Sequence, residues 1–298
     1  MIASVTVTYH PDLAALQRQL GSMATQVHAM VVVDNGSPGL LLASLRELCA
    51  KMGALLLPLS TNQGIGAAQN AGIAQARQQG AQWILLLDQD SEATPDMVGT
   101  LHAALQAQPR AAAAGPSSID QRTGTHSFFV TDPGWWPRRW QPEAGVSHPP
   151  IEVGFLIASG TLLCCAALGD TPPMRANWFI DHVDSEWCLR MRAQGWLLLG
   201  VSDAVLQHRL GDKVTRIWLL RWRQVAHHSP LRDYYMFRNS ILLAREAYVP
   251  LRWKLYFLSR LVQFAGFFLP FAPERGRRLR MMATGILHGL QGRTGPYR

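Results

Sequence analysis

The chain has 298 residues, 48% of them hydrophobic and 16% charged, which suits one large domain or a domain with an appendage and excludes a largely disordered protein. The net charge is +8, and residues 247–298, with nine Arg or Lys and one acidic residue, account for all of it. This distribution excludes a chain that is basic throughout and predicts an anionic partner for the C-terminal region alone.

The first 90 residues alternate short apolar runs with stretches of helical spacing. Strands are expected over 2–8, 29–33, 54–59 and 83–87, and helices over 13–23, 40–52 and 65–79. Each expected strand is a continuous apolar run, which is typical of a parallel sheet covered by helices on both faces. We therefore predict an α/β fold that binds its ligand at the carboxyl ends of the strands.

Polar side chains follow several of these strands. Asp88-Gln89-Asp90 comes directly after the fourth strand, and Tyr9 and Asp34 follow the first two. Two carboxylates one residue apart offer hard oxygen ligands to Mg²⁺ or Mn²⁺, which would clamp a diphosphate. The alternative is an ordinary acidic turn. Asp34 could accept a hydrogen bond from a nucleotide base, or could support the turn at Asn35-Gly36.

Residues 62–70 form a glycine-containing turn from a strand into a helix. Backbone N–H groups at a helix N-terminus suit a phosphate or a sugar hydroxyl, so Asn62, Gly64 and Asn70 are candidate donor-binding residues. The turn lacks the third glycine of a dinucleotide-binding fingerprint and the GK[ST] of a phosphate-binding loop.

The middle of the chain is less regular. Residues 117–150 are rich in Gly, Pro and Trp and predict an irregular loop over a site, and an apolar segment over 154–168 follows. A helix is expected from Asp181 to about residue 194. Asp184 on it is a candidate general base, although a capping Asp181 and a favourable charge at the helix N-terminus would explain the same residues.

The second half ends in a short strand, one histidine and a helical tail. A strand is expected over 197–201, and His208 beyond it is either structural or a third metal ligand. Ser229 followed by Pro230 predicts a helix start. Aromatic and basic residues then alternate, as on a helix at an anionic membrane surface; core packing or an oligomer interface are the alternatives.

Cysteine usage and hydropathy bear on location. None of the four cysteines forms a CxxC pair, a pattern that fits a reducing cytosol. The N-terminus shows no basic stretch followed by a long apolar run, so no signal peptide is expected. The best candidate membrane segment, 261–272, is too short to span a bilayer and contains Gln263 and Pro270.

Taken together, the motifs resemble the family 2 glycosyltransferases, and their rhamnosyltransferase branch in particular. The segments that carry the resemblance across nearly the whole chain are 32–37, 62–72, 88–90, 179–190 and 232–239. The resemblance implies a GT-A fold and an inverting, metal-dependent transfer of a sugar from a nucleotide-diphosphate donor. dTDP-rhamnose is the favoured donor and a UDP-hexose the alternative.

The resemblance also implies a role for each candidate residue. Asp184 would be the catalytic base, although many relatives have Glu-Asp where this chain has Val183-Asp184. The remaining assignments are Thr8, Tyr9 and Asp34 for the base of the donor, Asp88 and Asp90 for the metal with His208 as a possible addition, Arg238 as a counter-charge for the diphosphate, and Ser159, Gly160 and Trp187 for the acceptor side.

The expected organisation is a catalytic domain over 1–225 and a helical region over 226–298 that contacts an anionic membrane surface or a second subunit. The acceptor would be a lipid-linked or surface glycan at the inner face of the cytoplasmic membrane, and no nucleic-acid partner is expected. Two alternatives stay open: a nucleotidyltransferase that makes nucleotide sugars, and a non-catalytic protein that binds membrane or nucleic acid through its basic tail.

Overall fold

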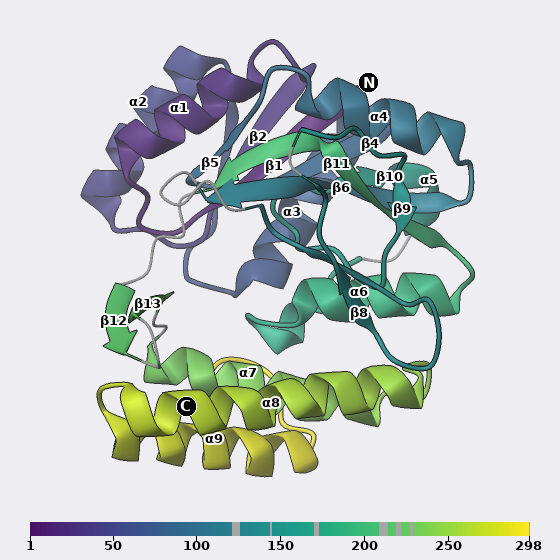
Figure 1. Ribbon diagram of the computed structural model, residues 1–298. Helices are drawn as coiled ribbons and strands as arrows, with labels where there is room; N and C mark the ends of the chain where they lie inside the picture. The colour runs from purple at the N-terminus through teal and green to yellow at the C-terminus, as the bar shows by residue number, and fades with distance from the viewer. Residues whose placement is uncertain are drawn as a thin grey trace.

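The computed structural model describes residues 1–120, 126–143, 145–169, 173–208, 214–218, 222–226 and 229–297. Most of these residues form a large sheet with helices on both faces, and three long helices near the C-terminus make a further layer beneath it (Figure 1). The predicted α/β class is confirmed.

Among the described residues, nine strands form one sheet in the order β3-β2-β1-β4-β10-β6-β11-β5, with β9 paired to β11. The strands are β1 (Ile2–Thr8), β2 (Ala29–Asp34), β3 (Leu55–Pro58), β4 (Trp83–Asp88), β5 (Ser91–Ala93), β6 (Ala111–Asp120), β9 (Ile151–Glu152), β10 (Leu162–Cys164) and β11 (Leu197–His208). The pairs among β1 to β4 are parallel, as is β6 with β11, whereas β5, β9 and β10 run antiparallel to their neighbours. The sheet is mostly parallel, as predicted.

Helices cover both faces of this sheet. They are α1 (Leu13–Met23), α2 (Gly39–Met52), α3 (Ile65–Gln78), α4 (Met97–Ala107), the short α5 (Cys165–Leu168) and α6 (Val183–Ala193), with a 3-10 turn η1 (Ala176–Trp178) before α6. In β4, Ile84 and Leu86 pack with α3 and α6, whereas Leu85 and Leu87 pack with α4. Successive side chains of a strand point to opposite faces, so a strand buried on both faces must be apolar throughout.

Two segments are more regular than predicted. Within 117–150, β6 continues to Asp120, and β7 (Phe129–Thr131) pairs with β8 (Arg138–Trp140) as a small hairpin. The strand expected over 197–201 extends to residue 208, with an irregularity between Val201 and Val205 where the register against β6 shifts. Residues 202–204 have no partner in β6, and an irregularity of this kind bends a strand and increases its twist.

The C-terminal region is helical, as predicted. It consists of α7 (Pro230–Arg245), α8 (Leu251–Phe271) and α9 (Arg275–Leu290), which lie together below α6 in Figure 1. Trp253 of α8 is fully buried, and a Cβ added to Gly154 would lie 2.1 Å from its ring. The Trp253 indole N–H also donates to Asp132 Oδ2 at 3.0 Å. α8 is therefore anchored to the sheet-bearing part of the chain.

In the described part of the chain, no helix combines the length and the apolar character needed to cross a membrane.

A further pair of strands, β12 (Val214–Trp218) and β13 (Trp222–Ala226), lies between β11 and α7 in the chain, and the two strands pair antiparallel. The boundary predicted between residues 225 and 226 stays a prediction.

Candidate active site

A cavity of about 410 Å³ opens where the carboxyl end of β4 meets the start of α6. Asp88, Ser159 and Asp184, three residues assigned from the sequence, line it together. They come from the end of β4, from the turn before β10 and from the first turn of α6. The cavity thus lies at the carboxyl end of the parallel strands, where the strand pattern predicted a ligand site. Ligand binding there stays a prediction.

Asp184 lies at the wall of this cavity, partly exposed to it. Its Oδ1 accepts a hydrogen bond from the backbone N–H of Ser185 at 2.7 Å, and its Oδ2 accepts one from the N–H of Ala158 at 3.3 Å. Burial raises the pKa of the Asp184 carboxyl above its ordinary value, against the opposing effect of these two hydrogen bonds. A positioned carboxylate with a raised pKa is what a general base near neutral pH requires.

The chain reaches Asp184 through a strained loop. Phe179, Asp181 and His182 all have positive φ angles, of 70°, 62° and 60°. Non-glycine residues rarely adopt this conformation, and they hold it only where the surroundings fix it. His182, not Asp181, occupies the N-cap position of α6. The capping role considered for Asp181 is therefore wrong.

Asn239 of α7 fixes this loop. Its side-chain amide donates to the carbonyl oxygens of Trp178, Ile180 and Asp181 at 3.0, 2.7 and 2.9 Å. Ser240 Oγ lies 2.8 Å from His182 Nε2. α7 therefore holds the loop that positions the candidate base.

Arg238 belongs to the same scaffold. Its guanidinium is fully buried and donates to the carbonyl oxygens of Trp178 and Gly295 at 2.8 and 2.6 Å, and to Asn239 Oδ1 at 2.9 Å. These three bonds and its burial leave no exposed surface for a diphosphate. The expectation that Arg238 is a counter-charge for the diphosphate is wrong in this structure.

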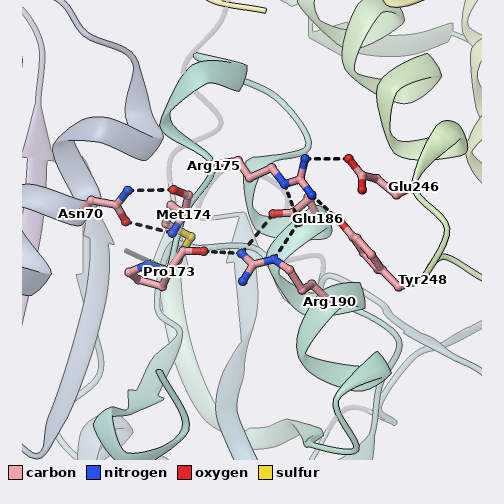
Figure 2. Close-up of polar contacts among 8 residues, drawn as sticks. All are labelled: Asn70, Pro173, Met174, Arg175, Glu186, Arg190, Glu246 and Tyr248. Carbon is pink, nitrogen blue, oxygen red and sulfur yellow. Dashed lines mark hydrogen bonds and ion pairs between the residues drawn. The ribbon is translucent and has the colours of Figure 1, made fainter. Parts of the chain in front are cut away.

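A second network holds α6 from its other side. Glu186 is fully buried, and its Oε1 accepts hydrogen bonds from Arg175 Nε at 3.0 Å, from Arg190 Nε at 2.8 Å and from the Tyr248 hydroxyl at 2.6 Å (Figure 2). Arg175 also reaches Glu246 at 2.6 Å. A buried carboxylate is tolerated when cations and donors surround it in this way.

Asn70 joins this network to α3 and does not face the cavity. Its side chain donates to the Met174 carbonyl at 2.7 Å and accepts from the Met174 N–H at 2.9 Å (Figure 2). Trp187 is likewise misassigned, because it is 2% exposed and packs in the main core rather than on an acceptor side. Both residues support the site without reaching it.

The polar groups of the turn at residues 62–64 form hydrogen bonds within the protein. Gly64 has a φ of 89°, and a Cβ there would lie 2.5 Å from the Phe179 carbonyl oxygen. The Ile65 N–H donates to that same oxygen at 2.7 Å. Asn62 Oδ1 accepts from the Gly64 N–H at 2.9 Å and from Asn35 Nδ2 at 3.1 Å. These groups seat the 179–182 loop on α3, and the Ile65 N–H is not open to a phosphate.

The residues assigned to the nucleotide base lie at neighbouring strand ends. Asp34 and Thr8 are fully buried, and Asp34 Oδ1 accepts from the Thr8 and Ser37 hydroxyls at 3.1 and 2.6 Å. Tyr9 is 46% exposed, and its backbone N–H donates to Gln89 at 2.9 Å. Of these three residues, Tyr9 is therefore the exposed one.

Asp88 and Asp90 are both partly exposed, and the Asp88 backbone N–H donates to Ser159 Oγ at 3.2 Å. Within the described ranges, no three His, Cys, Asp or Glu side chains form a ready-made metal site. The backbone of His208 pairs with Ser91 and Asp120, and its side chain lies outside the described residues. Mg²⁺ is commonly bound by one or two carboxylates together with substrate phosphates, so Asp88 and Asp90 fit a metal that arrives with a diphosphate.

Arg232 lies in the candidate site but was not assigned to it from the sequence. It lines the cavity with Asp88 and Asp184, its side chain is 40% exposed, and its Nε lies 3.1 Å from Asp181 Oδ1. It belongs to the same 232–239 motif from which Arg238 was chosen.

Gly160 is buried near Asp88 with a φ of 84°, and its N–H donates to the Leu86 carbonyl oxygen at 2.7 Å. Gly160 thereby shapes the turn that carries Ser159.

This fold and this site define a class of enzyme. The model of glycosyl transferase family 2 matches residues 4–169, more than half of the chain, and the chain belongs to that family. Its described fold is GT-A, and it aligns with a solved structure of GalNAc-T7 with UDP, GalNAc and Mn²⁺ at a TM-score of 0.61 and 14% identity, over 98% of this chain and 56% of that one. The expectation of a glycosyltransferase is confirmed over that of a non-catalytic binding protein.

Two named relatives indicate which branch of the family the chain resembles. The chain is 33% identical over 250 residues to the dTDP-rhamnosyl transferase RfbF of Shigella flexneri. The alignment covers 84% of this chain and 82% of the relative. It is 27% identical over 284 residues to the N-acetylglucosaminyl-diphospho-decaprenol L-rhamnosyltransferase of Mycobacterium tuberculosis, over 84% and 88% of the two chains. The resemblance to the rhamnosyltransferase branch is confirmed.

Proposed function

We propose that this glycosyltransferase transfers rhamnose from dTDP-rhamnose to a hydroxyl of a lipid-linked or surface glycan, with inversion at the anomeric carbon. The observation that carries the proposal is the shared cavity of Asp88 and Asp184. In this proposal Asp88 lies on the diphosphate side of the cavity and Asp184 takes the proton of the acceptor hydroxyl. The two rhamnosyltransferase relatives support the choice of donor.

Asp184 acts as the general base in this proposal. The acceptor oxygen bonds to the anomeric carbon as Asp184 takes the hydroxyl proton, and the bond from that carbon to the diphosphate breaks on the opposite face. The raised pKa of Asp184 makes it a stronger proton acceptor than an ordinary aspartate. The N–H groups of Ala158 and Ser185 hold the carboxylate in place.

The departing dTDP gains negative charge that must be stabilised. Arg232 is the one Arg or Lys among the described residues that line the cavity, and it is the proposed counter-charge in place of Arg238. Asp88 and Asp90 are the residues that would hold Mg²⁺ or Mn²⁺. When bound, such an ion would neutralise charge on the diphosphate.

The donor is tested by titrating the purified protein with dTDP, UDP and GDP by calorimetry, first with Mn²⁺ and then with EDTA. Tight binding of dTDP that EDTA abolishes is the expected result. A preference for UDP would replace rhamnose by a hexose or N-acetylhexosamine as the donor sugar. A folded protein that binds none of the three nucleotides would contradict the proposed donor class.

We also propose that α9 rests on the anionic inner face of the cytoplasmic membrane. Its exposed apolar residues recur at helical spacing, at Leu279, Ile286, Leu287 and Leu290, with exposures of 55%, 37%, 53% and 61%. Exposed Arg275, Arg277 and Arg280 lie on the same helix. An apolar stripe beside cations suits a membrane of anionic lipid.

Cosedimentation with vesicles that contain or lack anionic lipid tests this location. Binding to the anionic vesicles alone is expected. A dimer in solution that does not bind either vesicle would favour a subunit interface on α9 instead.

A further inference from the structure

A second and larger cavity adjoins the candidate active site. Its volume is about 710 Å³, and it lies between α8, α7 and the segments 127–130 and 155–157. Aromatic side chains dominate its wall, including Phe129, Phe155, Phe257, Phe264, Phe267 and Phe268. Well-packed interiors contain few voids larger than a water molecule, so an apolar space of this size is suited to a ligand.

The two cavities share part of their walls. Ile157, Asp181 and His182 line both of them. A molecule that fills the larger cavity would therefore reach the loop that leads to Asp184. His182 is positioned between the two by its contact with Ser240, which also lines the larger cavity. An extended ligand with one apolar and one polar end would fit this arrangement.

The polarity of the larger cavity restricts its occupant. Arg260 and Gln263 of α8 line it and are exposed, so they lie at an opening, and Arg260 Nη1 donates to Gln263 Oε1 at 3.4 Å. The other polar side chains of the lining are Ser127, Thr161, Asp181, His182, Ser185, Ser240 and Tyr256, and Asp181 and His182 belong to the wall shared with the smaller cavity. The phenylalanine side chains that α8 contributes carry no polar atom. A peptide bound along these aromatic side chains would leave its backbone N–H and C=O groups without hydrogen-bond partners, at a free-energy cost. A hydrocarbon chain has no such groups.

We propose that this cavity binds the hydrocarbon chain of an isoprenoid diphosphate acceptor, with the chain along the α8 aromatic residues and the sugar end at Asp184. This proposal rests on the lipid-linked acceptor proposed above. Arg260, which lines the larger cavity, is the proposed cation for its phosphates, and Arg232 in the smaller cavity stays assigned to the donor diphosphate. The site would thus select the lipid carrier separately from the donor nucleotide.

The experiment measures how affinity depends on chain length in the purified full-length protein. The probes are dimethylallyl diphosphate, with five carbons, and farnesyl diphosphate, with fifteen, below the concentration at which the latter forms micelles. Binding about tenfold tighter or more is expected for farnesyl diphosphate, because each added methylene is removed from water. Equal affinity for the two probes would overturn the proposal.

Two matched variants of α8 locate the binding. Phe267→Glu places a charge in the cavity wall and is expected to remove the gain from chain length. Val262→Glu changes a 74% exposed residue outside the lining of the cavity and is expected to keep it. Equal effects of the two variants would overturn the proposal, because they would indicate adhesion to the helix surface.

Photolabelling of the unaltered protein covers the case in which Phe267→Glu does not fold. A diazirine-bearing farnesyl diphosphate should label peptides that contain 127–130, 155–157 or 256–268. Labelling confined to α9 would overturn the assignment. A parallel titration with dTDP separates the two proposals: farnesyl binding without dTDP binding would contradict only the donor, and dTDP binding without farnesyl binding would contradict only this cavity.

Discussion

The hydroxyl of Tyr248 donates to Glu186 Oε1 at 2.6 Å and so joins the segment after α7 to the helix that carries Asp184. Burial, and then the hydrogen bond to Glu186, raise the pKa of the Tyr248 hydroxyl, so it stays protonated and remains a donor at any working pH. Glu186 in turn pairs with Arg175 and Arg190. The position of the candidate base thus depends on contacts made more than 60 residues away in the chain.

Tyr248→Phe tests this contact as a stability effect. The variant keeps the ring and removes the donor to a buried carboxylate, and hydrogen bonds to charged groups are worth about 1.5–3 kcal/mol. We expect the free energy of unfolding, measured by urea denaturation, to fall by that amount. Tyr9→Phe, at a 46% exposed position, is the control and should change it by less than about 0.5 kcal/mol. Equal effects of the two substitutions would contradict the role of Tyr248.

Asp184→Asn should lower kcat by about 10²–10⁴-fold, because a general base is lost, while nucleotide affinity stays unchanged. In the unaltered enzyme the base must be ionised, so activity should fall as pH drops through the raised pKa of Asp184. The acid limb of the pH–rate profile should therefore lie above the range of an ordinary aspartate. Full activity of the Asn variant would exclude Asp184 as the base.

Asp184 should also affect stability in the opposite direction from a salt-bridged aspartate. Its folded-state pKa is raised, so the folded protein binds its proton more tightly than the unfolded chain does. The contribution of this group to stability is therefore largest at low pH and is lost as pH rises through its unfolded and then its folded pKa. The difference in stability between the parent and Asp184→Asn, followed across pH, checks this sign.

Asp90→Asn should weaken the Mn²⁺-dependent binding of dTDP and leave the fold intact, because it removes one of the two carboxylates proposed to hold the metal. Asp96→Asn is a matched control: Asp96 is exposed, precedes α4 and makes no side-chain capping bond. Calorimetry with Mn²⁺ and with EDTA separates the two variants. If Asp90→Asn binds dTDP and responds to EDTA like the parent, the metal assignment is wrong.

Arg232 and Arg238 should respond in opposite ways to substitution by Gln. Arg232→Gln is expected to lower kcat by roughly 10²-fold with little change in stability, because it removes a partly exposed charge that faces the cavity. Arg238→Gln should lower the free energy of unfolding by about 1–3 kcal/mol for each buried acceptor left without a donor, because the carbonyl oxygens of Trp178 and Gly295 lose the guanidinium. Kinetics paired with urea denaturation distinguish them, and the reverse pattern would restore Arg238 as the diphosphate ligand.

Leu287→Glu on α9 should weaken cosedimentation with anionic vesicles several-fold, since it puts a negative charge into the apolar stripe. Added salt should weaken the binding of the parent protein as well. Leu40→Glu on α2, at a 91% exposed position, is the control and should bind like the parent. Equal losses in both variants would indicate a change of net charge rather than a surface on α9.

Local patterns in the amino-acid sequence were enough to predict the sheet and part of the site. Strands such as 83–87 are apolar at every position because both faces are covered, and this pattern alone predicted a mostly parallel sheet. It also placed Asp88 at its carboxyl edge. Asp184 could be assigned because its motif resembles that of a known family. The start of the helix at Pro230 was also predicted locally, because the fixed φ of proline suits the first helical position; Ser229 occupies the N-cap position without a side-chain capping bond.

Local patterns do not distinguish the roles of residues that share a motif, because those roles depend on packing between distant segments. Arg232 and Arg238 lie six residues apart on α7, and at 3.6 residues per turn their side chains leave the helix in different directions. One faces the cavity and the other is buried against η1 and residue 295. Asn70 and Trp187 were misassigned for the same reason: the direction of a side chain depends on which distant segment packs beside its helix, and a local pattern does not contain that information.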